Sequence, residues 1–128
     1  MRRCASGIFL THNRWNQSSK SGFCAMGNLG DDPCRHQTVL AFMSDFALLG
    51  TALLPHPYTG MSKNLQSASL DHALWFHRPF RADEYLLYCL DSPTAAGCRG
   101  FSRGAFYTRD GILVASTAQE SLLRPLQS

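Results

Sequence analysis

The sequence of 128 residues lacks the cysteine spacing of a metal-binding or disulfide-built domain. Its five cysteines are odd in number and none of them forms a C-x-x-C pair, so the pattern favours neither a zinc site nor a disulfide framework. Small buried thiols in a reducing compartment are the expected alternative. No metal and no cofactor is predicted.

Long apolar runs are also absent. The longest, residues 47–54, contains Gly50 and Thr51 and is far shorter than the roughly 20 residues that span a bilayer. We therefore predict no membrane-spanning helix. With 45% hydrophobic residues the chain nevertheless has enough apolar side chains to fold as one globular domain.

Charged residues are few, and the two signs are unevenly distributed. Only 16% of the residues are charged, and the first 30 carry four Arg or Lys and no acid, whereas the rest are close to neutral. Nucleic-acid binding requires a basic surface, which the nearly neutral residues after the first 30 do not provide, so no nucleic-acid partner is expected. Residues 1–31 are predicted to be a basic, poorly ordered leader, and a transit peptide is the alternative for their composition.

One long apolar helix is predicted over residues 32–54. Asp32 is expected to be its N-cap, with Pro33 in the first helical position, where the missing N–H costs nothing. Pro55 ends the helix. Apolar residues occupy nearly every side of it, which is typical of a buried helix that other elements wrap.

Asp45 is the only Asp, Glu, Lys or Arg between His36 and Leu54. Burial of a single carboxylate raises its pKa or costs several kcal/mol of folding free energy. A lone acid in an apolar helix is therefore a functional candidate, and a hydrogen-bonded structural Asp is the alternative.

Four strands are predicted after the helix. The first, residues 69–80, alternates between polar and apolar residues and ends at Pro79. The others span residues 84–91, 98–108 and 111–120, and a hairpin turn is expected at Asp110-Gly111. A buried helix followed by an antiparallel meander indicates an α+β fold in which the sheet curls around the helix.

Three stretches carry a resemblance to a known family: Met43-Ser-Asp-Phe46, Ser69-Leu-Asp-His-Ala-Leu-Trp-Phe-His-Arg-Pro-Phe80, and the run from Arg99 to Glu120. Together they resemble the C-terminal hot-dog domain of acyl-CoA thioesterase II, a family that includes the bacterial enzyme and the peroxisomal acyl-CoA thioesterase of animals. The resemblance implies a hot-dog fold over residues 32–128, with a central helix wrapped by a curved antiparallel sheet.

The resemblance also implies an activity and three site residues. Family members hydrolyse fatty acyl-CoA to free fatty acid and coenzyme A, and their catalytic Asp, Thr or Ser, and Gln correspond to Asp45, Ser69 and Gln119. Asp45 would be the base toward a water molecule that Ser69 and Gln119 orient by hydrogen bonds. Ser69 is not expected to be a nucleophile, because no motif places a His beside it. Taken singly, Ser69 and Gln119 are equally compatible with polar residues that satisfy a strand edge.

The chain also departs from the family pattern. Residues 1–34 do not match the family, so its N-terminal hot-dog domain and the strand before its central helix are expected to be missing. A hot-dog domain normally pairs with another, and we therefore expect a homo-oligomer or pairing with a second hot-dog domain. A remnant that binds acyl-CoA or a partner subunit without turnover is the alternative function. The resemblance is compatible with the cytoplasm or the peroxisome, and the final Leu126-Gln127-Ser128 is not a peroxisomal tripeptide.

Overall fold

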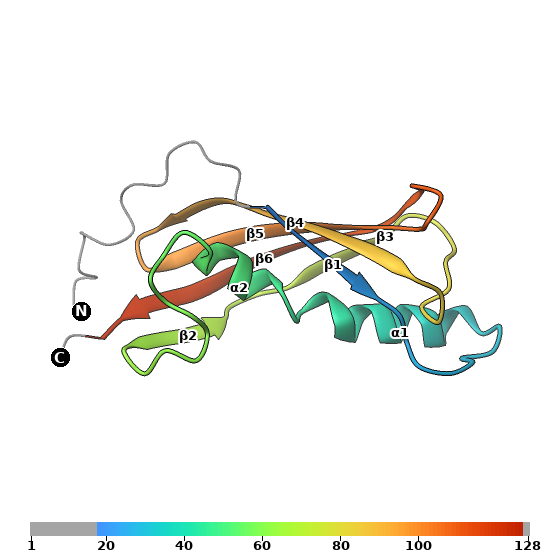
Figure 1. Cartoon of the computed structure of the whole chain (residues 1–128), viewed down its shortest axis with the longest axis horizontal. Helices are drawn as coiled ribbons and strands as arrows, with labels where there is room; N and C mark the ends of the chain where they lie inside the picture. Colours follow the sequence, from blue (N-terminus) through green and yellow to red (C-terminus); the bar gives the residue numbers. More distant parts are fainter. Residues whose placement is uncertain (1–17, 127–128) are drawn as a thin grey trace.

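A six-stranded antiparallel sheet curls over two helices in the computed structural model of the protein, which describes residues 18–126 (Figure 1). The helices are α1 (Pro33–Ser44) and α2 (Leu48–Leu53). The strands are β1 (Ser18–Phe23), β2 (Leu65–Ser69), β3 (Ala73–Phe76), β4 (Leu86–Ala96), β5 (Arg99–Tyr107) and β6 (Leu113–Pro125). Their order is β1-β4-β5-β6-β2, and β3 also pairs with β6. The predicted α+β hot-dog arrangement is confirmed.

The meander of β4, β5 and β6 forms the middle of the sheet and follows three of the predicted strands. The β5–β6 turn forms where expected, with Gly111 at φ 79°, a conformation that glycine adopts without strain. The prediction that a strand ends before Ser92 is wrong, because β4 continues to Ala96. A register shift between Asp91 and Thr94 leaves the intervening Pro outside the ladder, where its missing N–H is tolerated.

The strand before the helix, which was expected to be missing, is present. β1 pairs with β4 along its whole length. Phe23 at its end packs against Tyr88 and Phe106, with ring centroids 5.9 and 6.4 Å apart. The backbone ladder and this one aromatic anchor hold a strand that otherwise contains Ser, Lys and Gly, which explains why the sequence pattern does not reveal it. Residues 1–17, the first part of the predicted leader, lie outside the described residues.

Two helices replace the single helix predicted over residues 32–54. The N-terminus is as expected, since the side chain of Asp32 accepts a hydrogen bond from Cys34 N–H at 3.0 Å. α1 ends at Ser44, however, and three non-helical residues separate it from α2. Neither helix is long and apolar enough to cross a membrane, and this holds for the part of the chain that the structure describes.

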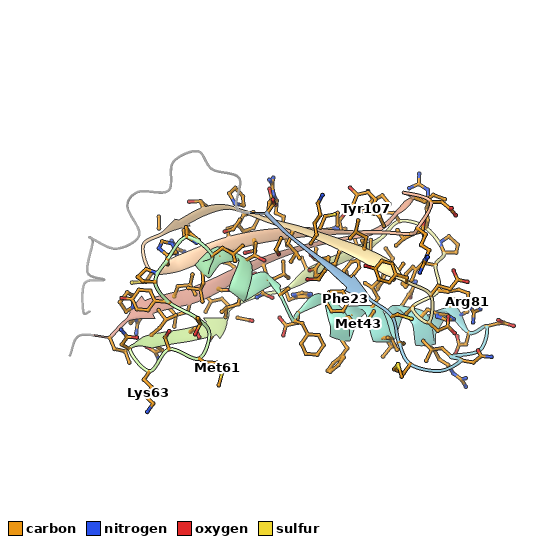
Figure 2. All side chains as sticks on the ribbon, viewed as in Figure 1. Phe23, Met43, Met61, Lys63, Arg81 and Tyr107 are labelled. Carbon is orange, nitrogen blue, oxygen red and sulfur yellow. The ribbon has the colours of Figure 1, made fainter. Side chains whose placement is uncertain are left out.

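The side of α1 away from the sheet is apolar but uncovered. Met43 lies on the side that faces the sheet, near Phe23 (Figure 2), whereas Phe42 and Phe46 are 71% and 65% exposed. The two exposed rings pack edge to face with centroids 5.0 Å apart. The prediction of a helix buried on all sides is therefore wrong for this chain, because the sheet covers only one face of it.

The interior consists of two apolar clusters with polar side chains between them. The inner face of β6 shows this division directly. Val114 at one end belongs to the cluster that includes Leu40 and Tyr88, and Leu123 at the other end belongs to the cluster of α2. Thr117, Gln119 and Ser121 lie between these ends, and each is at most 3% exposed. Such buried polar groups require partners, so this part of the interior is where specific contacts are expected.

Polar contacts also fix the segment before α1 to the segment that leads into β4. Asp83, whose side chain is 8% exposed, accepts hydrogen bonds from the Arg81 guanidinium and from Leu29 N–H, each at 2.9 Å. The bonds from Arg81 first, and that from Leu29 next, lower the pKa of Asp83 to about 2.

This lowered pKa predicts an acid-sensitive contribution to stability. The contribution is present above about pH 4, the ordinary value of the group, and is lost as the pH falls toward about 2. Denaturant unfolding of Asp83→Asn should give a lower free energy of unfolding at pH 6 and a flatter pH dependence between pH 4 and 2 than the wild type. Asp110→Asn, in an exposed turn, is the matched control. Parallel pH dependences of wild type and Asp83→Asn would contradict this assignment.

Candidate functional site

A bulge at residues 70–72 decides which side chains of the edge strand face the interior. Ser69 pairs with Ser121, and Ala73 pairs with Ala118, so three residues on this strand lie opposite two on β6. An extra residue of this kind bends the strand and reverses the alternation of its side chains. Inward side chains are therefore odd-numbered in β2 and even-numbered after the bulge.

The prediction of a single alternating strand over residues 69–80 is wrong for this reason. At the bulge a side chain replaces the regular ladder, since Asp71 Oδ1 accepts the backbone N–H of Glu120 at 2.7 Å. The regular alternation of an unbroken strand would place Ser69 and His72 on opposite faces of the sheet. With the bulge, both side chains reach the same inner position of β6.

That position is occupied by Gln119, which is fully buried. Its Oε1 lies 2.8 Å from Nδ1 of His72. Its Nε2 donates hydrogen bonds to Ser69 Oγ and Ser121 Oγ, both at 3.1 Å. Two of the predicted site residues, Ser69 and Gln119, are therefore in direct contact, and the amide has a partner for each of its two N–H groups.

His72 extends this network to the end of α1. Its Nε2 lies 2.8 Å from Oγ of Ser44, the last residue of the helix. Its Nδ1 lies 4.0 Å from Oδ1 of Asp45. The third predicted residue, Asp45, is thus joined to Gln119 through His72, a residue that the sequence analysis did not assign to the site.

Asp45 itself is not the buried carboxylate that the sequence predicted. It is the C-cap of α1, and its side chain is 61% exposed. The helix breaks at this residue, on the side that also exposes Phe42 and Phe46. In the single chain the carboxylate is therefore open to solvent on one side and faces His72 on the other.

Tyr88 supports the site from behind. Its ring is fully buried and stacks on Phe106, with centroids 3.8 Å apart. Its hydroxyl donates to the backbone oxygen of Ser44 at 2.8 Å and lies 2.9 Å from Thr117 Oγ1. Burial raises the pKa of Tyr88 to about 12, so the phenol remains a neutral donor at physiological pH and fixes the residue that precedes Asp45.

Ser102 provides unused hydrogen-bonding capacity next to Gln119. The two residues are paired across β5 and β6, and Ser102 is 1% exposed. Its Oγ has no hydrogen-bond partner among the described residues. A buried hydroxyl without a partner is rare in proteins, and here it leaves one donor and one acceptor unused in the interior beside Gln119.

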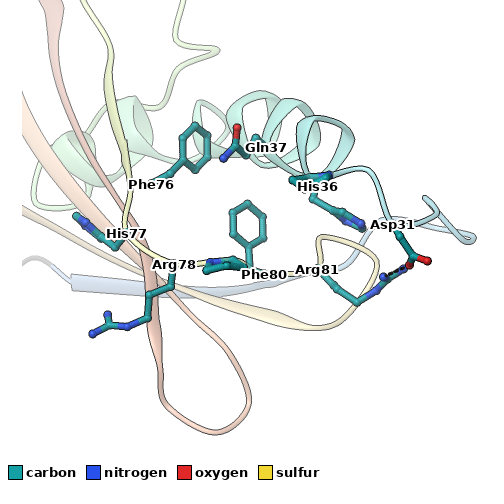
Figure 3. Close-up of a pocket in the computed structure, with 10 residues that line it drawn as sticks. Asp31, His36, Gln37, Phe76, His77, Arg78, Phe80 and Arg81 are labelled. Carbon is teal, nitrogen blue, oxygen red and sulfur yellow. Dashed lines mark hydrogen bonds and ion pairs between the residues drawn. The ribbon is translucent and has the colours of Figure 1, made fainter.

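A separate hollow of about 400 Å³ lies at the other end of α1 (Figure 3). Phe76 and Phe80 line it as a stacked pair with centroids 6.1 Å apart, and the ion pair of Asp31 with Arg81 lies at its rim. None of the three predicted site residues lines this hollow. It is therefore distinct from the network around Gln119.

The described residues do not suggest a metal site. Within residues 18–126 no group of three His, Cys, Asp or Glu side chains is arranged to hold a metal ion. Cys24 and Cys34 have free, exposed sulfurs, so the expectation of small buried thiols is wrong for them. Both lie next to the loop before α1, away from the two apolar clusters.

Comparison with known proteins gives consistent matches. The model of the acyl-CoA thioesterase family matches residues 11–122, so the expectation that residues 1–34 do not match the family is wrong for residues 11–34. Acyl-coenzyme A thioesterase 8 from Mus musculus is 48% identical over 101 residues, which cover 78% of this chain and 31% of that protein. Acyl-CoA thioesterase 2 from Haemophilus influenzae is 42% identical over 88 residues, or 69% of this chain and 31% of that protein. The chain thus spans about a third of the length of these curated relatives.

Solved structures give the same result. The acyl-CoA thioesterase II TesB2 from Mycobacterium marinum superposes with a TM-score of 0.78 at 46% identity, covering 84% of this chain and 41% of that one. A thioesterase from Haemophilus influenzae superposes with a TM-score of 0.62 at 12% identity, covering 87% of this chain and 73% of that one, and at this identity the likeness concerns the fold alone.

Proposed function

The chain belongs to the acyl-CoA thioesterase family, and on this premise we propose that its hot-dog domain supplies the water-activating site for hydrolysis of fatty acyl-CoA to fatty acid and coenzyme A. The observation that carries the proposal is the buried amide of Gln119. It donates to Ser69 on one side and meets His72 on the other, and His72 faces Asp45. The amide of Gln119 therefore connects the other two residues that the family resemblance assigns to catalysis, Ser69 directly and Asp45 through His72.

Hydrolysis of a thioester requires a base, a held water and donors for the developing oxyanion. Asp45 is the base in this proposal, because its carboxylate is open to an approaching ligand and has the imidazole of His72 4.0 Å away on its other side. Ser69 is the donor. Since its Oγ already accepts a hydrogen bond from Gln119, its own hydroxyl hydrogen is free to point toward a water or a carbonyl oxygen.

The proposed reaction then follows in two steps. Water attacks the thioester carbonyl carbon while Asp45 takes one of its protons, and the hydroxyl of Ser69 stabilises the negative oxygen of the tetrahedral intermediate. Collapse of the intermediate breaks the carbon–sulfur bond, and the proton on Asp45 passes to the departing coenzyme A sulfur. Ser69 is not the nucleophile in this scheme, because its partner is the amide of Gln119, which is no base, and that amide lies between Ser69 and His72.

Binding of acyl-CoA without turnover is the second candidate, and one observation favours it. Asp45 is 61% exposed in the single chain, and an exposed carboxylate lacks the dry surroundings in which electrostatic catalysis is strong. The two candidates differ in one measurable respect, which is the release of free coenzyme A.

Pairing with a second hot-dog domain is part of the proposal. The expectation based on a missing first strand no longer applies, because β1 covers that edge. What supports pairing instead is the exposed aromatic pair at the end of α1, where Phe42 and Phe46 are 71% and 65% exposed and their rings pack against each other. Clusters of large exposed apolar side chains mark interaction surfaces, and this one adjoins Asp45.

Substitution of the three site residues tests the proposed activity. The purified chain should release free coenzyme A from fatty acyl-CoA, and Asp45→Asn should abolish the release because the nearly isosteric amide cannot take a proton. Ser69→Ala and Gln119→Ala should each lower turnover by roughly ten- to a thousandfold, since an orienting or oxyanion hydrogen bond is worth about 1.4–4 kcal/mol of barrier.

Asp110→Asn, in the exposed β5–β6 turn, controls for the loss of a carboxylate, and thermal unfolding of each variant controls for folding. Near wild-type turnover in Asp45→Asn would remove this residue from the mechanism. Binding of acyl-CoA by a wild-type chain that releases no coenzyme A would decide for the second candidate.

Sedimentation velocity tests pairing. At micromolar concentration the chain should sediment as a dimer or with a hot-dog partner domain, and Phe42→Ser combined with Phe46→Ser should shift it toward the monomer. Ile112→Ser, which replaces a 46% exposed apolar residue at a distant turn, should leave the distribution unchanged. A wild-type chain that is a stable, cooperatively unfolding monomer would contradict the proposed pairing.

A further inference from the structure

We propose that His72 is a positioning residue that fixes the orientation of the Gln119 amide and thereby keeps the hydroxyl of Ser69 available as a donor. The inference rests on the proposed function and adds a residue to its machinery. The geometry of the network supports it, since Nδ1 of the imidazole lies 2.8 Å from Gln119 Oε1 and 4.0 Å from Asp45 Oδ1.

The edge strand is distorted in a way that turns His72 inward. Three residues oppose two at this point, and Asp71 accepts the N–H of Glu120 that the regular ladder would use. An unbroken strand would satisfy the backbone of β6 without this substitution. The distortion brings a second polar side chain, in addition to Ser69, to the one buried amide of the inner face.

The hydrogen-bond donors and acceptors around Gln119 differ in how strictly they fix the orientation of its amide. The serine hydroxyls on the other side of the amide, Ser69 and Ser121, can donate or accept, so they fit either orientation of Gln119. The imidazole is more selective. A proton on Nδ1 of His72 requires the amide oxygen in front of it, whereas a bare Nδ1 requires the amide nitrogen. The orientation of Gln119 therefore follows the proton of His72.

The carboxylate of Asp45 keeps the proton of the imidazole on Nδ1. The nearby negative charge of Asp45 favours a proton on the nitrogen that faces it. Nε2 faces the Ser44 hydroxyl, which accommodates either state, because its single proton can go to Nε2 or to the backbone oxygen of Ala41 at 2.7 Å. The carboxylate of Asp45 thus orients the amide of Gln119 through the imidazole, in addition to its role as a base.

The orientation matters for catalysis because it decides what Ser69 offers to the substrate. With Nε2 of Gln119 toward Ser69, the hydroxyl accepts and its hydrogen is free to bind the developing oxyanion. With the amide reversed, the serine hydrogen is used up in a bond to Oε1, and only a lone pair faces the substrate. A change at His72 should therefore lower kcat and leave substrate binding nearly unchanged.

Two conservative variants of the full chain separate this role from a merely structural one. In His72→Asn the amide nitrogen can replace Nδ1, two bonds from the β-carbon, whereas in His72→Gln it can replace only Nε2. His72→Asn should retain kcat within about threefold, and His72→Gln should lose roughly ten- to a hundredfold in kcat at a KM within about twofold. His77→Gln, on the exposed side of the sheet, is the control. Equal losses in both variants, or no loss in either, would overturn the proposal.

Nitrogen-15 NMR of the wild-type chain gives a readout that does not depend on activity. We expect a protonated Nδ1 on His72, and a side-chain amide of Gln119 whose resonances shift in His72→Gln and remain close to their positions in His72→Asn. If the chain releases no coenzyme A, the proposed function fails, and this measurement still decides the role of His72. An unprotonated Nδ1, or a Gln119 amide indifferent to both variants, would refute it.

Discussion

The hydrogen-bonding demand of one buried amide is the constraint on which the site depends. Gln119 lies on the inner face of the strand that joins the two apolar clusters, and an unpaired amide there would cost about 1–3 kcal/mol of folding free energy for each unsatisfied group. Three residues satisfy it, namely Ser121 from β6 itself, Ser69 just before the bulge and His72 at the end of the bulge. The bulge in the backbone thus lets both Ser69 and His72 bind the amide of Gln119.

The break in the helix follows from the same region. The backbone oxygen of Ser44 accepts the hydroxyl of Tyr88, whereas a continuing helix would bond it to a backbone N–H four residues later. The Ser44 side chain is also engaged, with Ala41 and His72. With both polar groups of this residue held, α1 ends, and Asp45 emerges at the end of the helix beside the imidazole. Core packing around Tyr88 therefore places the carboxylate.

Sequence reasoning predicted the local features and missed the non-local ones. The N-cap at Asp32 and the β5–β6 hairpin were predictable because their signals lie within a few residues. Ser69 and Gln119 were found through the family resemblance, and their contact confirms only that they are neighbours. His72 was missed because a bulge depends on pairing with a distant strand, although two adjacent polar residues within an alternating run were a usable sign of it. β1 was missed because its residues bury little apolar surface and rely on backbone pairing.

The exposure of Asp45 is a property of the single chain, and the proposed pairing would change it. Phe46 follows Asp45 directly in the chain and packs on Phe42, so a partner surface seated on these rings would lie beside the carboxylate. Removal of water there would strengthen the interaction of the Asp45 carboxylate with the N–H dipole of His72, since electrostatic interactions are stronger in a medium of low dielectric constant. On the proposed function, pairing and catalysis are then one event: the contact that buries the aromatic rings also dries the base, strengthens its hold on the imidazole and fixes the amide of Gln119.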